Sequence, residues 1–115
     1  MIDFACEQFD ITSIIKCSFS MTKADLKILY FMAGKSSEWY TTEAIAKKLK
    51  LNLSTVQRAV KKLYEKGLAE RNQNNLDNGG YIFIYKSKPK KEINTIIMRI
   101  VNGWVSKVES ELSKW

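Results

Sequence analysis

Hydrophobic and polar positions follow the period of an α-helix over much of this chain. The apolar residues from Phe4 to Lys16 keep that period except near Asp10–Thr12, and they predict an N-terminal helix. A second helix is expected after Thr22, whose hydroxyl suits an N-cap. Its largely apolar run ends at Gly34, which suits the left-handed position after a helix. A helix this apolar belongs at the centre of a core.

Two shorter amphipathic helices follow this apolar helix. The first is predicted to begin after the N-cap Thr41 and to end at Leu51. The second covers about residues 53–66, between Asn52 as its cap and Gly67 as its left-handed end. Its apolar residues recur at i, i+4 and i+7 and form one face: Val56, Val60 and Leu63. On a helical wheel the opposite face is polar and mostly basic: Ser54, Arg58, Lys61 and Glu65.

The pattern then changes to that of a β-hairpin. Residues 68–71 and 81–85 predict two strands, the second rich in β-branched and aromatic side chains. Residues 72–80 between them are mostly Asn, Asp and Gly, which favour turns. Residues 38–40 leave room for a short third strand. Pro89 stops the hairpin and suits the first turn of a last helix.

The last helix, within residues 89–115, carries the longest apolar stripe of the chain. Apolar residues recur at i, i+3, i+4 and i+7 over a length of roughly 35 Å at 1.5 Å per residue. A stripe of that size is too large for a small domain to cover alone, so we expect a second copy of the chain to cover it. The predicted dimer interface comprises Ile93, Ile96, Ile97, Ile100, Val101, Trp104, Val108 and Leu112.

The charge of the chain is concentrated in one segment. The 115 residues include 19 Lys and Arg against 12 Asp and Glu, a net charge of +7. Residues 41–66 alone contribute a net +5, whereas residues 1–40 contribute −1. An anionic partner is therefore expected at the two short helices.

Composition narrows the class of protein. With 45% hydrophobic and 27% charged residues the chain is expected to be one globular domain. It has no His, hence no imidazole base and no Ser-His-Asp triad, and it contains no Gly-rich phosphate loop, so we expect no enzyme, cofactor or metal. No apolar run approaches the roughly 20 residues that span a bilayer, and the start carries acid, so a cytoplasmic protein without a membrane partner is expected.

Three linked motifs carry a family resemblance. Thr41–Leu49 is similar to T-x-x-x-I-A-x-x-L, Ser54–Leu63 to S-T-V-x-R-x-x-x-x-L, and Lys66–Arg71 to K-G-L-V-x-R. In this order and spacing they resemble the winged helix-turn-helix of the MarR and TrmB-like transcriptional regulators. The resemblance implies an α+β, mainly helical chain, with a β-hairpin wing and long terminal helices that form a dimer. Its segments, in a single structural domain, are residues 1–20 as a dimer contact, residues 21–88 as the DNA-binding unit and residues 89–115 as the dimerisation helix.

The resemblance also implies how such a chain binds DNA. The helix at 53–66 would enter the major groove, where Gln57 suits adenine and Arg58 suits guanine, although either side chain also suits phosphate. The lysines of both helices suit phosphates, but a solvated lysine face is the alternative. The hairpin tip, residues 73–78, has no cation, which leaves Arg71 at its base as the better wing contact. The candidate DNA-binding residues are Thr41, Thr42, Lys47, Lys48, Ser54, Thr55, Gln57, Arg58, Lys61, Lys62, Arg71, Gln73 and Asn74.

Two functions from different classes agree with this pattern. The first is a sequence-specific regulator that binds double-stranded DNA as a homodimer on pseudo-palindromic operators, with a small-molecule effector as a further partner that the resemblance allows. The second is a winged-helix protein-interaction module in a transcription or replication assembly. Cys6 and Cys17 would lie about 16 Å apart along a continuous helix, too far for a disulfide, and buried structural roles are favoured over redox sensing.

Overall fold

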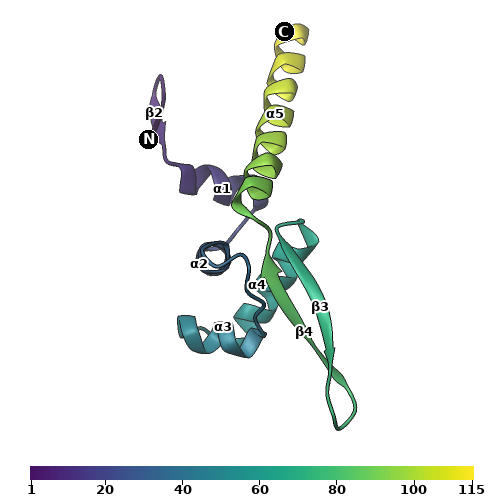
Figure 1. The fold of residues 1–115 in the computed structure, drawn as a ribbon. Coiled ribbons are helices and arrows are strands. Elements are labelled where there is room, and N and C mark those ends of the chain that lie inside the picture. The colour runs from purple at the N-terminus through teal and green to yellow at the C-terminus, as the bar shows by residue number, and fades with distance from the viewer. The chain divides into compact units, whose positions relative to one another are not determined.

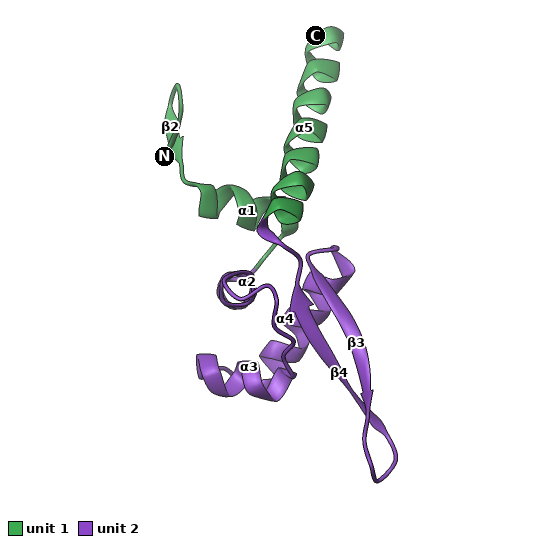
Figure 2. Ribbon diagram, in the orientation of Figure 1, with its two compact units in different colours: residues 1–21, 91–115 green, residues 22–90 purple.

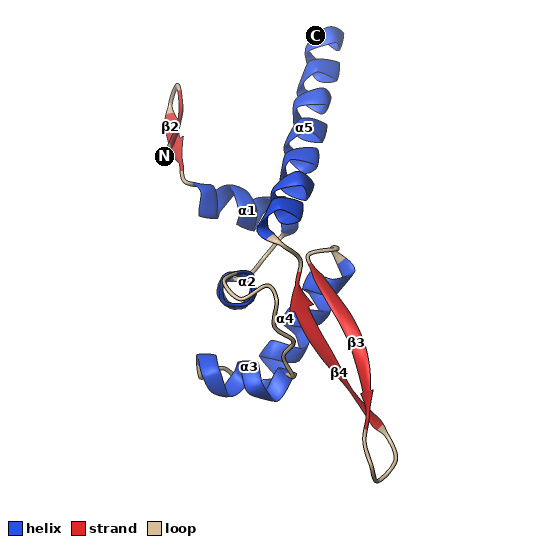
Figure 3. Ribbon diagram, viewed as in Figure 1, coloured by secondary structure: helices blue, strands red, loops and turns tan.

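The computed structural model of the protein describes residues 1–115 (Figure 1). Helices make up most of the chain and the strands form two small hairpins (Figure 3), which confirms the prediction of a mainly helical α+β winged-helix fold. The helices are α1 (Ile11–Phe19), α2 (Lys23–Ala33), α3 (Thr42–Leu49), α4 (Leu53–Glu65) and α5 (Lys90–Lys114). The strands are β1 (Ile2–Phe4), β2 (Glu7–Phe9), β3 (Ala69–Asn75) and β4 (Tyr81–Ser87).

The chain divides into two compact units, coloured separately in Figure 2. Residues 1–21 and 91–115 form one unit, and residues 22–90 form the other. The two terminal segments thus belong to one unit, and the prediction of a single structural domain stays a prediction. Residues 22–90 contain the two short helices that the charge pattern singled out, together with the large hairpin.

The core of residues 22–90 is built around α4, which contacts α2, α3 and β3. Four α4 side chains have no exposed surface, and they are joined by fully or almost fully buried residues of the neighbouring elements. Each buried aliphatic side chain of this size stabilises the fold by about 1.5–3 kcal/mol. The α4 residues are Val56, Ala59, Val60 and Leu63, and their neighbours in the core are Ile28, Leu29, Met32, Ile45 and Leu68.

Local hydrogen bonds explain where the helices begin. Thr22 accepts a hydrogen bond from the Asp25 N–H, and the Asp25 carboxylate accepts one from the Thr22 N–H, so α2 begins with a complete capping box. Thr41 caps α3 by accepting from the Ala44 N–H at 3.1 Å. Asn52 holds the N-cap position of α4 without a side-chain hydrogen bond. The expected caps are therefore in place, although only the two threonines bond the backbone.

The helix ends agree less well with the sequence. Gly67 has the expected left-handed conformation after α4, with φ of +78°. Gly34 does not: its φ of −67° is right-handed, because its N–H still bonds the Tyr30 carbonyl and the chain continues into another turn. The prediction of a left-handed Gly34 is wrong. Lys50 takes the left-handed position after α3, and α5 begins at Lys90, one residue after Pro89.

The large hairpin, called the wing below, pairs β3 with β4 from Ala69↔Ser87 to Asn75↔Tyr81. Its strands are longer than predicted, because residues 72–75 belong to β3 rather than to the turn. Their partners Tyr81–Ile84 are aromatic and β-branched, and cross-strand pairing with them overrides the turn preference of asparagine. The expected short strand at residues 38–40 is reduced to one bridge, in which Tyr40 and Tyr85 exchange two hydrogen bonds of 2.8 Å.

The N-terminal segment differs most from the prediction. Instead of one helix from Phe4 to Lys16, it forms the antiparallel hairpin β1–β2 followed by α1. Asp10 begins α1 because its carboxylate accepts from the Ser13 N–H at 2.8 Å, which also lowers the pKa of Asp10. Cys6 lies in the hairpin turn and Cys17 in α1, so they do not share a helix face, and both are free and exposed rather than buried.

One contact beside the Tyr40 bridge gives a measurable titration. The Tyr40 hydroxyl donates to Glu38 at 2.6 Å, and this hydrogen bond to a carboxylate raises the pKa of Tyr40 to about 12. We expect Glu38→Gln to lower that pKa by about one unit, because the amide carries no charge. An alkaline ultraviolet titration of the five tyrosines measures this change, with Tyr40→Phe identifying its component. If the pKa of Tyr40 is the same in Glu38→Gln as in wild type, Glu38 is not the cause of the raised pKa.

Candidate nucleic-acid interface

The helix-turn-helix is formed by α3 and α4, which contact each other directly. After α3, the left-handed Lys50 turns the chain, and the Leu51 N–H bonds the Ala46 carbonyl at 3.0 Å. Only three residues then separate the two helices. The short turn sets the angle at which α4 leaves α3.

The face of α4 opposite its buried residues is exposed and carries two cations. Val56 and Val60 point into the core, so the residues roughly half a turn away point to solvent. The chain's ion pairs involve neither Arg58 nor Lys61, so both cations are unneutralised. The exposed residues of this face, called the basic face below, are Ser54, Arg58, Lys61 and Glu65.

The other candidate residues of the two helices surround this face. Lys47 and Lys48 are exposed in the last turn of α3, and Thr55 is half-buried beside Val56. Thr41, Thr42 and Gln57 come together with wing residues around a cavity of about 310 Å³. Gln57 therefore lies on the wing side of α4. The remaining residues that line this cavity are Glu43, Ile82, Phe83 and Tyr85.

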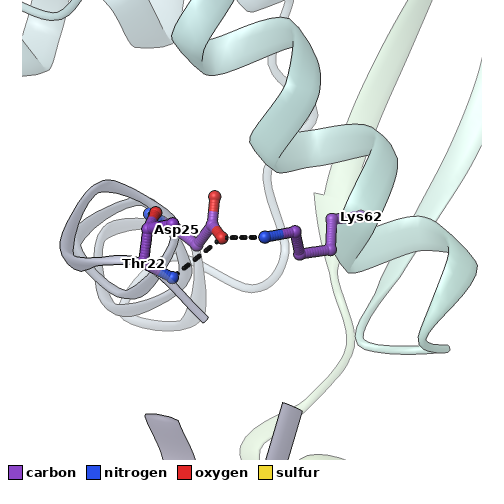
Figure 4. Close-up of polar contacts among 3 residues, drawn as sticks. All are labelled: Thr22, Asp25 and Lys62. Carbon is purple, nitrogen blue, oxygen red and sulfur yellow. Dashed lines mark hydrogen bonds and ion pairs between the residues drawn. The ribbon is translucent and has the colours of Figure 1, made fainter. Parts of the chain in front are cut away.

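Lys62 has a charged partner within the chain. Its ammonium donates to the Asp25 carboxylate at 2.5 Å, across the contact between α4 and α2 (Figure 4). The Asp25 side chain is 7% exposed and that of Lys62 is 34% exposed, so the pair lies at the edge of the core. The structure thus gives Lys62 a carboxylate partner within the chain, because α2 brings Asp25 within its reach. The expected phosphate contact of Lys62 stays a prediction.

Asp25 remains charged in this position. Burial alone raises the pKa of Asp25. The hydrogen bonds from Lys62 and from the Thr22 backbone lower it by more than burial raises it, so the pKa of Asp25 lies below its ordinary value of 3.8. The folded protein therefore holds the carboxylate more strongly ionised than the unfolded chain does. The stabilisation is present above the unfolded pKa and is lost as the pH falls through the folded one.

We therefore expect Asp25→Asn to destabilise the protein at pH 7 by about 1–3 kcal/mol, because it removes the charge that Lys62 and the capping box satisfy. The difference from wild type should shrink as the pH is lowered below about 4, where the wild-type carboxylate also protonates. Urea unfolding at several pH values measures both effects. Asp77→Asn, in the exposed turn of the wing, is the matched control. A difference that stays constant between pH 7 and pH 3 would refute the ionised pair.

The wing places its candidate residues on two faces. Arg71 and Gln73 lie opposite Tyr85 and Phe83 on one face of the hairpin, whereas Asn74 belongs to the other face. The Arg71 guanidinium lies over the rings of Tyr64 and Phe83, 4.3 Å from each centroid. Tyr64 comes from the last turn of α4. Tyr64 and Phe83 are not predictable from the sequence, because no local pattern shows that a helix end and a strand meet at one arginine.

The unit of residues 1–21 and 91–115 exposes much of the predicted dimer interface. Ile93 and Ile97 are buried, and Ile96, Ile100 and Val101 are half-buried. Farther along α5 the apolar side chains are open: Trp104 is 61% and Leu112 57% exposed, with Val105 and Val108 exposed between them. The β1–β2 hairpin of the same unit exposes Ile2 and Phe4.

No group of three or more His, Cys, Asp or Glu side chains is placed to hold a metal ion. None of the five helices combines the length and the apolar character that crossing a membrane requires.

Comparison with known proteins identifies the family. Residues 9–108 match the DnaD N-terminal domain. The chain is a member of the DnaD N-terminal domain family. The winged-helix resemblance is confirmed at the level of the fold, whereas membership of the MarR or TrmB-like regulators in particular stays a prediction.

Relatives of this DnaD N-terminal domain protein include archaeal chains of similar length. The uncharacterized protein MJ1503 of Methanocaldococcus jannaschii is 32% identical over 110 residues, which cover 96% of this chain and 79% of the relative. A structure described as a possible transcriptional regulator from Methanosarcina mazei Go1 is 47% identical, with a TM-score of 0.95, and the match covers 100% of this chain and 96% of the other.

The fold is also shared with the MarR family. A structure of a proposed MarR-family transcriptional regulator from Enterococcus faecalis V583 matches with a TM-score of 0.54 at 12% identity, covering 98% of this chain and 100% of the other. At that identity the likeness is one of fold.

Proposed function

We propose that the protein is a transcriptional regulator that binds double-stranded DNA sequence-specifically, with α4 in the major groove. The observation that carries the proposal is the basic face of α4, where Arg58 and Lys61 are exposed and unneutralised directly opposite the buried side of the helix. A helix of this kind presents its N-terminal residues to base edges while the preceding helix lies across the backbone. The possible transcriptional regulator from Methanosarcina mazei Go1, which is similar to the whole chain, supports this function.

The residues of the interface divide by role. Arg58 carries a planar guanidinium that suits guanine O6 and N7, and Ser54 beside it suits either a base or a phosphate. Lys47, Lys48 and Lys61 suit phosphates, which raises affinity for any sequence and makes it dependent on salt. Lys62, which pairs with Asp25, also contributes through the position of α4.

We expect Arg58→Ala to weaken binding to a duplex selected from random-sequence DNA by about tenfold to a hundredfold, because it removes one bidentate base contact. Binding to unselected duplex should fall much less, and the melting temperature should stay close to that of wild type, because Arg58 is exposed. Fluorescence anisotropy with both duplexes measures the two affinities. Arg99→Ala, an exposed arginine of α5, is the matched control. Equal losses on both duplexes would remove the base-reading role of Arg58.

We also propose that the chain acts as a homodimer through α5 and the N-terminal segment. The exposed apolar residues of α5 continue the stripe that begins at Ile93, and monomeric proteins rarely leave such a surface open. A two-fold dimer would present two copies of α4 to half-sites about one helical turn apart, as in a pseudo-palindromic operator. We propose this assembly, and an effector site within it, by analogy with MarR-type regulators.

The dimer is tested by placing a charge in the stripe. Ile100→Asp should yield monomers in sedimentation at micromolar concentration, because a carboxylate in an apolar interface costs several kcal/mol. Asn102→Asp adds the same charge to the opposite face of α5 and should leave the dimer intact. Wild-type protein that sediments as a monomer at micromolar concentration would refute the proposal.

One observation favours a second function, a protein-interaction module in a transcription or replication assembly. The tip of the wing carries no cation, and it exposes Leu76, Tyr81 and Ile82. Apolar side chains at a tip without a cation suit a protein surface better than a DNA groove. Wild-type protein that shows no salt-dependent binding to any duplex would favour this function over the first.

A further inference from the structure

The wing and α4 meet in a stack of flat side chains around Arg71. Its guanidinium carbon lies 4.3 Å from the ring centroid of Tyr64 and 4.3 Å from that of Phe83. Tyr81 lies next to Phe83 toward the tip, with the ring centroids 5.4 Å apart in an edge-to-face contact. The stack thus joins the last turn of α4 to both strands of the wing.

Arg71 differs from the other cation of the wing strands. Lys86 is already engaged: its ammonium lies 5.0 Å from the Trp39 ring centroid and 3.9 Å from the Glu70 carboxylate. Lys86 also belongs to the face of the hairpin opposite Arg71. Arg71, by contrast, is exposed and has no ion pair with any carboxylate of the chain.

Stacking affects the two parts of a guanidinium differently. Where its flat faces contact rings, its five N–H donors lie in the plane and point outward from the edge. A ring contact of this kind is worth about 0.5–1 kcal/mol at an exposed site and restricts the rotamers of a long side chain. The donors of Arg71 are therefore held in one direction before any partner arrives.

We propose that Tyr64 and Phe83 are positioning residues that hold Arg71 as a pre-oriented phosphate-binding fork at the junction of wing and α4. This inference rests on the proposed DNA binding. It names the contact by which a wing whose tip lacks a cation binds the DNA backbone. Arg71 supplies the charge at the base of the wing, and the two rings supply its orientation.

The test measures binding of the full chain to a fluorescein-labelled random-sequence duplex of about 24 base pairs across a range of KCl concentrations. We expect Arg71→Ala to reduce the slope of log affinity against log salt by about 0.9, the value for one phosphate. Tyr64→Leu should weaken binding about threefold to tenfold while keeping much of the slope, because the charge remains and only its orientation is lost. Tyr64→Phe keeps a ring over Arg71 and should bind like wild type.

The double variant separates positioning from independent contacts. In the Arg71→Ala background, Tyr64→Leu should cause no further loss, because there is no guanidinium left to orient. Trp39→Leu removes the corresponding ring from Lys86 on the opposite face and should leave affinity and slope unchanged. Circular dichroism melting of each variant checks that it folds, and Arg71→Lys, which keeps the charge without the flat stack, should retain the slope but lose affinity.

The outcomes distinguish this inference from the proposed function. Losses from Tyr64→Leu and Arg71→Ala that multiply in the double variant would overturn the positioning role, and so would wild-type affinity in Tyr64→Leu. Unchanged affinity and slope in Arg71→Ala would overturn the phosphate contact itself while leaving DNA binding by α4 intact. Wild-type protein that does not bind the duplex would instead overturn the proposed function.

Discussion

Burial of one side of α4 fixes the direction in which the cations of this helix point. Val56, Val60 and Leu63 have no exposed surface, and each contributes about 1.5–3 kcal/mol by leaving water. Turning the helix by one residue, about 100°, would expose part of this set and move Arg58 toward the core, where an unpaired charge is far more costly. The basic face therefore results from apolar packing on the other side of the helix.

The same packing pairs one cation of α4, Lys62, with a carboxylate at the edge of the core. Lys62 lies on the flank of α4 that meets α2, and the capping box places the Asp25 carboxylate there with little exposure to water. A buried carboxylate without a partner would destabilise the fold, so the lysine that satisfies it serves the core. The net charge of residues 41–66 consequently overstates the charge available to an anionic partner.

The wing shows how far local patterns reach. The expected strands and the glycines of the turn are present, and Gly79 and Gly80 have φ of +86° and +82°. The length of β3 was underestimated, because the partners of residues 72–75 lie in β4 and not among their neighbours in the chain. The prediction of an N-terminal helix from Phe4 was wrong for a related reason. The apolar spacing of this segment fits a helix only loosely, whereas residues 2–4 and 7–9 pair as β1 and β2 and the helix starts only after the Asp10 cap.

The sequence by itself determined the winged-helix order of elements, the threonine caps of α2 and α3, the buried face of α4 and the exposed basic face opposite it. These features follow from spacing within one helix or from hydrogen bonds between residues three apart. Only the tertiary structure decided that Lys62 pairs with Asp25 and that Arg71 stacks on Tyr64 and Phe83. Each of these contacts joins residues from different elements, and their meeting depends on how whole helices and strands pack.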